Sequence, residues 1–254
     1  MMKNLISCLI IFISLSISSV NASVDYDIKA VTRTYPVALS FIGTLGYGHK
    51  FWGSDSGPMY GYIRPSVYAQ TSGVINGLGA QVDFFPVSFL GFYAGSKIVK
   101  RGVDELGSYN CATVICNGTM KRNYIGFKLG LAFKGAFLFI DGKKEDAKVD
   151  KRIGVFAEVT GTLLGQSGGD DLTQVTSIIG YELTKTFSIG ALVQHSQMEK
   201  LKNKSVMSLG ITRMNFKPWS ITIGAGQFHT RQSSDHFTVL ALFGWSGSKG
   251  VQLL

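Results

Sequence analysis

Charge is scarce in this chain, and beyond its N-terminal segment the sequence has no long uncharged apolar run. Asp, Glu, Lys and Arg make up only 16% of the 254 residues, whereas hydrophobic residues make up 45% and the mean hydropathy is +0.20. A membrane-spanning helix needs about 18 or more consecutive apolar residues, and no segment after the N-terminal one approaches that length. The mature chain is therefore too apolar for a typical secreted soluble protein, yet it offers no spanning helix.

Cysteine and histidine are also scarce, which argues against a disulfide-dense scaffold and against a metal centre. Of three cysteines, Cys8 lies in the apolar N-terminal segment, which leaves Cys111 and Cys116. Their close spacing between two strand candidates predicts a disulfide that closes a small surface loop, with free thiols as the alternative. No metal-ligand spacing and no phosphate-binding loop appears, so we expect neither a metal nor a cofactor.

The N-terminal segment has the features of an export signal. Lys3 supplies a positive charge, Leu5 to Val20 form an uncharged run of mostly Leu, Ile, Phe and Ser, and Ala22-Ser23 offers small residues for cleavage. We therefore expect residues 1–22 to be a signal peptide, cleaved near 22/23, and residues 23–254 to form one domain.

Most of the mature sequence alternates large apolar residues with small or polar ones, which is the signature of β-strands. One example is Ile125, Phe127, Leu129 and Leu131, separated by Gly126, Lys128 and Gly130. This pattern predicts twelve strands, at 37–48, 59–71, 73–85, 88–100, 119–133, 135–141, 151–164, 172–184, 186–198, 204–215, 218–229 and 235–245.

The polar face of these strands favours a membrane barrel over a soluble sandwich. It consists mostly of Gly, Ser, Thr and Ala, as suits a confined lumen behind a lipid-facing apolar band, and the 31 glycines fit a small curved barrel. The sequence thus predicts an all-β, antiparallel transmembrane β-barrel of about 12 strands. Short and long connections do not alternate regularly before residue 165, so 10 or 14 strands stay open, and 26–35 is a candidate for a missing strand.

Together these features resemble the integral outer-membrane β-barrel proteins of Gram-negative bacteria. The last strand, with Phe237, Phe243 and Trp245 on one face, is similar to the strand that barrel insertion machinery reads in such proteins, although nine residues follow Trp245 here. The resemblance implies an outer-membrane location and contact with membrane lipid, and it leaves a homo-oligomer such as a trimer open.

Charges on the small or polar strand faces are the candidate functional residues. A Lys or Arg facing lipid at mid-depth would cost about 2–4 kcal/mol, so these side chains should point inward. Two outcomes compete: a narrow pore for small solutes with a mild anion preference, or a plugged, non-conducting structural or surface-interaction barrel. The pore-lining candidates are Arg64, Asp83, Lys97, Lys128, Glu158, Glu182 and Arg213.

Two lysine-rich stretches, 141–152 and 199–204, are expected to be loops that either contact lipopolysaccharide phosphates or are solvated charged loops with no partner. The basic residues are dispersed and the chain is exported, which argues against a nucleic-acid partner. A hydrolase at the barrel rim is a weaker alternative, because adjacent His195 and Ser196 point to opposite faces of a strand and cannot act as base and nucleophile. We therefore predict no catalytic residues.

Overall fold

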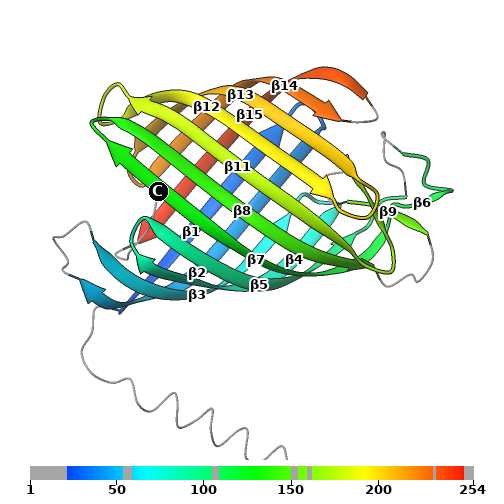
Figure 1. The fold of residues 1–254 in the computed structure, drawn as a ribbon, viewed down its shortest axis with the longest axis horizontal. Helices are drawn as coiled ribbons and strands as arrows, with labels where there is room; N and C mark the ends of the chain where they lie inside the picture. Colours follow the sequence, from blue (N-terminus) through cyan, green and yellow to red (C-terminus); the bar gives the residue numbers. More distant parts are fainter. Residues whose placement is uncertain are drawn as a thin grey trace, which may run out of the picture.

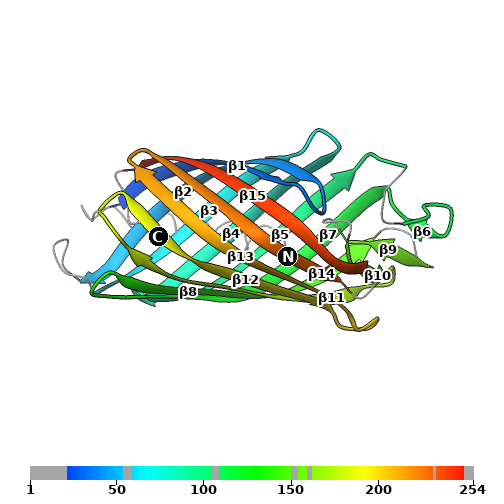
Figure 2. The same cartoon turned by 90° about the horizontal axis from the view of Figure 1, so that it is seen from above.

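The computed structural model describes residues 22–53, 59–104, 109–149, 154–158, 162–230 and 233–248. These residues form a closed barrel of twelve antiparallel strands and a small three-stranded sheet at one end of it (Figures 1 and 2). Within these ranges, no helix has the length and apolar character needed to cross a membrane. The expected signal peptide, residues 1–22, lies almost wholly outside the described residues.

Each barrel strand pairs with its neighbours in sequence, and β1 pairs with β15 to close the ring. The barrel strands are β1 (Ala22–Arg33), β2 (Ala38–Gly53), β3 (Tyr60–Thr71), β4 (Ile75–Val87), β5 (Leu90–Arg101), β7 (Gly118–Phe133), β8 (Ala136–Val149), β11 (Asp170–Glu182), β12 (Phe187–Met198), β13 (Asn203–Phe216), β14 (Trp219–Thr230) and β15 (Ser233–Ser248). The small sheet, called the loop sheet here, consists of β6 (Val114–Ile115), β9 (Val155–Ala157) and β10 (Leu164–Gln166).

The strand count of twelve is confirmed, but the prediction placed one strand wrongly. Residues 26–35 belong largely to β1, whereas 151–164 is not a barrel strand and supplies β9 of the loop sheet. Residues 142–149, expected in a loop, continue β8. With these corrections, the two long connections, 102–117 and 150–169, lie at one end of the barrel, called the loop end. The start of β1 and the end of β15 lie at the other, called the terminal end.

The outer surface of the barrel is an apolar band. Outward side chains such as Leu78, Ile125, Ile179 and Phe237 are more than 60% exposed, which is costly in water and favourable in lipid. Barrel strands of 12–16 residues exceed the roughly 9–11 needed to cross a bilayer. Closure matters here, because a bilayer cannot satisfy the hydrogen bonds of an open sheet edge.

Aromatic side chains gather on the outer face at the terminal end. Trp219 stacks against Trp245 with ring centroids 5.8 Å apart and lies 5.0 Å from Phe243, while Tyr26 meets Trp245 edge-on at 5.3 Å. Amphipathic aromatic rings are favoured at the boundary between lipid and water. This cluster lies where β1 pairs with β15 to close the barrel. It marks the level at the terminal end where the boundary between lipid and water is expected.

Candidate functional site

The barrel interior has two chemically different walls. On the side of β12 to β15, the inward residues form an apolar cluster consisting of Leu192, Met207, Leu209, Ile211, Phe228 and Leu240. On the side of β1 to β8, the inward residues carry most of the interior charge, arranged in two ion networks.

The first network lies toward the terminal end and joins β1, β3, β4 and β7. Arg64 donates to both carboxylate oxygens of Asp25, with its Nε 2.8 Å from Oδ2. The same guanidinium lies 3.5 Å from Asp83, which Lys128 approaches at 3.2 Å. Asp25 and Asp83 are fully buried, so their charges depend on these partners.

The second network lies toward the loop end and is centred on Arg122 of β7. Arg122 is buried and pairs with Glu145 of β8 and, at 2.9 Å, with Glu158 of the loop sheet. Lys97 and Lys143 lie 3.3 and 3.2 Å from the other oxygen of Glu145. Three cations therefore surround two carboxylates, which leaves this network one positive charge in excess.

Tyrosines cover the wall between the two networks. The ring of Tyr124 lies across Gly95 of β5, and the ring of Tyr93 lies across Gly126 of β7, where a Cβ atom would collide with them. The Tyr93 hydroxyl donates to Asp141 at 2.6 Å, while the Tyr124 hydroxyl donates to Gln81. These rings thus lie along the wall instead of projecting across the lumen.

Three adjoining cavities run through the interior. The largest, about 420 Å³, lies at the terminal end, and it shares Lys128 and Asp141 with a central cavity of about 220 Å³. A third, about 150 Å³, shares Lys97, Lys143 and Gln174 with the central cavity and reaches the loop sheet. The central cavity is lined by Tyr68, Gln81, Tyr93, Lys97, Tyr124, Lys128, Asp141, Lys143, Gln174 and Thr176.

The loop sheet enters the barrel at the loop end. Phe156 and Leu163 are 0% and 1% exposed and pack against inward residues of β7, β8, β11 and β12. The barrel residues in this cluster are Met120, Ala147, Val149, Leu172 and Met198. Burying two large side chains contributes roughly 1.5–3 kcal/mol each, so residues 154–158 and 162–166 are held against the barrel interior and narrow it at this end.

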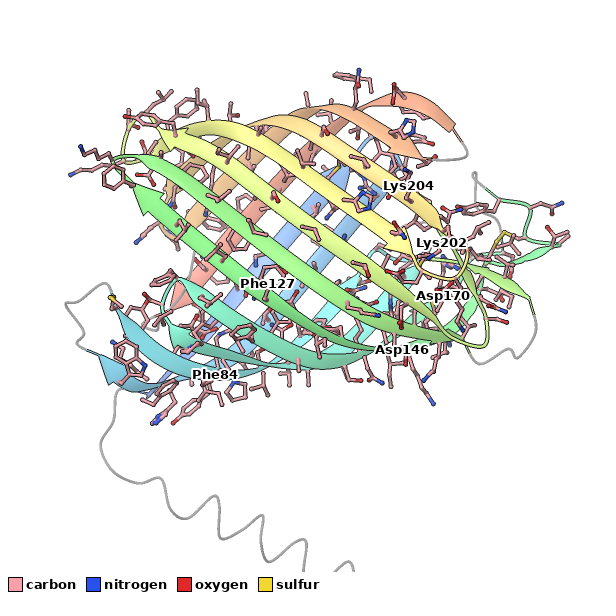
Figure 3. The ribbon with its side chains drawn as sticks, in the orientation of Figure 1. Phe84, Phe127, Asp146, Asp170, Lys202 and Lys204 are labelled. Carbon is pink, nitrogen blue, oxygen red and sulfur yellow. A yellow bond between two sulfur atoms is a disulfide. The ribbon has the colours of Figure 1, made fainter. Side chains whose placement is uncertain are left out.

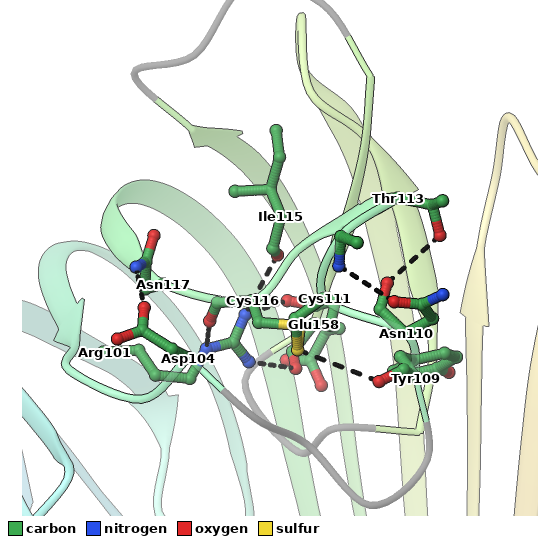
Figure 4. Close-up of a disulfide and its surroundings, with 12 residues drawn as sticks. Arg101, Asp104, Tyr109, Asn110, Cys111, Thr113, Ile115, Cys116, Asn117 and Glu158 are labelled. Carbon is green, nitrogen blue, oxygen red and sulfur yellow. Dashed lines mark hydrogen bonds between the residues drawn. A yellow bond between two sulfur atoms is a disulfide. The ribbon is translucent and has the colours of Figure 1, made fainter.

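Arg101 ties this constriction to the disulfide loop (Figure 4). Cys111 and Cys116 are bonded in the structure, and Arg101, at the end of β5, donates to the carbonyl oxygens of Ile115, Cys116, Ala157 and Glu158. β6 also pairs with β9 in parallel, joining Val114 to Val155. Burial in this loop raises the pKa of the Tyr109 hydroxyl.

Most of the charges expected at the lumen do line the interior. Arg64, Asp83, Lys97, Lys128 and Arg213 all border one of the three cavities. Glu158 also borders a cavity, but from the loop sheet and not from a barrel strand. Glu182 is the last residue of β11 and is exposed at the rim of the terminal end.

Several interior charges were not among the candidates. Five further charged residues take part in the networks or line a cavity: Asp25, Arg122, Asp141, Lys143 and Glu145. Three of these lie in the stretch that was treated as a lysine-rich loop. The alternation Asp141, Lys143, Glu145 would have placed them on one strand face.

The structure places His195 and Ser196 on opposite faces of β12, as the alternation of the strand predicts. Ser196 faces inward and accepts from Gln174, while His195 lies on the opposite face, and Glu199 accepts from Thr173. His229 and Asp235 form an exposed pair at 2.9 Å on the outer face. The part of the chain that the structure covers holds no group of three or more His, Cys, Asp or Glu suited to a metal ion.

Comparison with known proteins adds a likeness of fold. No protein-family model matches the sequence, and no curated protein matches it. Among solved structures, the chain is similar to the NanC porin, with 12% identity over 89% of this chain and 100% of that one and a TM-score of 0.48. It is also similar to the KdgM porin (11%, 87% and 98%, 0.44) and to the beta domain of the Bordetella autotransporter BrkA (9%, 88% and 98%, 0.42).

Proposed function

We propose that this protein is an outer-membrane pore for small solutes, narrowed by its loop sheet and mildly selective for anions. The single observation that carries the proposal is the run of polar cavities through a closed barrel whose exterior is apolar. Outer-membrane barrels have polar interiors whether they are open or plugged, so the buried charges alone do not distinguish the two. The cavities support a pore, because they adjoin one another from the terminal end to the loop sheet and charged side chains border each of them.

The anion preference rests on the residues of the central cavity. Lys97, Lys128 and Lys143 reach it, against Asp141 as the one carboxylate among its lining residues. Asp141 already accepts from Tyr93, and Lys97 and Lys143 share Glu145. We therefore expect the central cavity to favour anions over cations only slightly.

Export and orientation complete the proposal. A signal peptide cleaved near 22/23 would bring the chain to the periplasm, where insertion machinery would read β15 with its outward Phe237, Phe243 and Trp245. Outer-membrane barrels have short periplasmic turns and long outer loops, so we propose that the loop end faces the outside of the cell.

A second function is a non-conducting surface-interaction barrel. The buried cluster around Phe156 and Leu163 favours it, because those residues fill part of the lumen at the loop end. The two functions differ in one measurable property, which is whether ions pass through the barrel.

Reversal potentials in planar bilayers test the pore and its selectivity together. In a KCl gradient, we expect wild-type channels to favour chloride slightly. The double variant Lys97→Gln and Lys128→Gln should shift the reversal potential toward cations, because it removes two positive charges from the central cavity.

The matched control carries the same charge change outside the lumen. Lys185 and Lys217 are exposed in terminal-end turns, so replacing both with Gln should leave the reversal potential unchanged. An absence of channel events would reject the pore in favour of the surface-interaction barrel. Equal shifts in the two double variants would show that the central lysines do not line the ion path.

A further inference from the structure

Three lysines gather on the outward face of the barrel near the loop end. Lys121 of β7 and Lys148 of β8 are direct cross-strand partners, and both are exposed. Lys100 of β5 lies diagonally beside Lys121, because its own partner is Thr119. Asp146, which Lys148 contacts at 2.8 Å, gives this group one negative charge against three positive ones.

Such a group is unfavourable without an anion. Like charges directly opposite each other on a sheet destabilise the pairing, and Lys121 and Lys148 are related in this way. An anionic ligand between them would reverse the sign of the interaction. A lysine ammonium is a compact charge with three donors and is a common ligand of phosphate.

An apolar groove lies on the same outward face, nearer the middle of the barrel. It has a volume of about 690 Å³ and crosses β4, β5, β7, β8 and β11. Gly142 lacks a side chain, so the ring of Phe127 lies across it, and Figure 3 shows Phe127 and Phe84 on this side. Ile125 and its partner Lys144 mark the end of the groove that is closer to the lysines.

The breadth of the lysine group and of the groove selects the kind of lipid. Lys100, Lys121 and Lys148 stand on three adjacent strands, about 10 Å across, and the groove crosses five strands. A glycerophospholipid carries one phosphate and two acyl chains, which would cover only part of this surface. A bisphosphorylated glycolipid carries two phosphates on a disaccharide and several acyl chains, which match the breadth of both.

We propose that Lys100, Lys121 and Lys148 bind a phosphate group of an outer-leaflet glycolipid whose acyl chains lie in the groove. Asp146 lies near the loop end in Figure 3. Lys144, at the margin of the groove, pairs with Asp171 at 3.1 Å. The inference needs the barrel in an outer membrane but not its conduction of solutes, so either can fail alone.

Lipid binding to the purified protein tests this site. The full mature chain, folded in a non-ionic detergent with a metal chelator present, is titrated with bisphosphorylated lipid A and the bound fraction is measured by native mass spectrometry. Replacing Lys121 and Lys148 with Gln should weaken binding by about tenfold or more, as expected when two charge-assisted hydrogen bonds are lost. Dephosphorylated lipid A and phosphatidylglycerol should bind the wild type correspondingly weakly.

The double variant Lys185→Gln and Lys217→Gln is the matched control, since it changes the net charge equally at the terminal end. It should bind lipid A as the wild type does. Unchanged binding by the Lys121 and Lys148 variant, or an equal loss in both double variants, would overturn the site. If phosphatidylglycerol bound as tightly as lipid A, the assignment of the ligand as a glycolipid would be wrong. Should the double variant not fold, Lys100→Gln carries the same comparison, because Lys100 makes no ion pair among the described residues, and Lys185→Gln is its single-site control.

Discussion

At the residue scale, Arg122 links the barrel wall to the loop sheet. Its guanidinium pairs with Glu145 of β8 and with Glu158, next to β9, and all three side chains are buried. A buried ion pair is weak support for stability in itself, but removing one partner leaves an uncompensated charge in a dry site. Arg122 is therefore the residue on which the loop-end interior depends most.

Replacing Arg122 with Gln should lower the free energy of unfolding by about 3–5 kcal/mol, because it leaves Glu145 and Glu158 without their shared cation. Urea unfolding of the detergent-solubilised protein, followed by tryptophan fluorescence, measures the change. Arg213→Gln is the control: Arg213 is inward but makes no ion pair among the described contacts, so it should cost less than about 1 kcal/mol. Equal losses in the two variants would contradict the role given to Arg122.

Single residues also show where sequence reasoning ends. The inward direction of Arg64, Asp83, Lys97 and Lys128 could be predicted, because alternation fixes the face of a residue once its strand is identified. The partners of these charges lie on other strands, and pairing depends on a closed barrel and its register. Arg122 lies six positions before Lys128 and on the same face of the predicted strand 119–133, so alternation would have identified it as an inward charge as well.

At the element scale, the segment 151–164 shows how alternation can mislead. Its apolar residues repeat every second position, yet Phe156 and Ala157 are both buried although they are adjacent. A strand in a barrel wall would expose one of them to lipid. The part of this segment that forms β9, residues 155–157, is instead enclosed on both sides, by β10 and β6 and by the barrel interior, so burial there no longer follows a period of two.

The opposite error was made for β8, where a strand was predicted to be a loop. The half of β8 nearer the loop end is lysine-rich, which is typical of a solvated loop. Its charges are divided between two faces: Lys143 and Glu145 turn inward, whereas Lys144, Asp146 and Lys148 turn outward. Strand propensity disfavours such residues, but ladders to β7 and β11 hold them in place. Composition alone therefore could not distinguish this strand from a loop.

The disulfide loop is expected to brace the loop sheet without supporting the barrel. Replacing Cys111 and Cys116 with Ser should leave the barrel folded, because the crosslink closes a short loop outside it and constrains the unfolded chain by only about 2–3 kcal/mol. The segment from 109 to 117 should become more accessible to protease, as should β9, which pairs with β6.

Limited proteolysis with mass-spectrometric mapping measures this, with the heat-modifiable gel mobility of the barrel as the control for folding. Cleavage confined to the strands of the barrel, or a barrel that no longer folds, would contradict the prediction that the disulfide stabilises the loop sheet and not the barrel.

At the scale of the whole molecule, the pattern of apolar and charged residues in the sequence is explained by one outer surface and two interior walls. The outer surface is apolar and bounded by aromatics at the terminal end and by lysines at the loop end. Inside, an apolar wall from β12 to β15 faces a charged wall from β1 to β8, with polar cavities between them. The loop sheet fills part of the interior at one end only.

The all-β class, the barrel, the strand count and the disulfide could be predicted from local pattern. The constriction could not, because the contacts of Phe156 and Leu163 with Met120 and Met198 join parts of the chain that only the closed barrel brings together.

The central claim is that the lumen is a pore narrowed by the loop sheet, and single-channel conductance tests it most directly. A variant in which a short Gly-Ser turn replaces residues 150–169 would remove β9, β10 and the Glu158 partner of Arg122, with Arg122→Gln included so that no buried cation is stranded. Channels of the wild type should be small, and those of the variant should conduct several-fold more current because the constriction is gone. Equal conductance in both proteins, or no channel in either, would contradict the account.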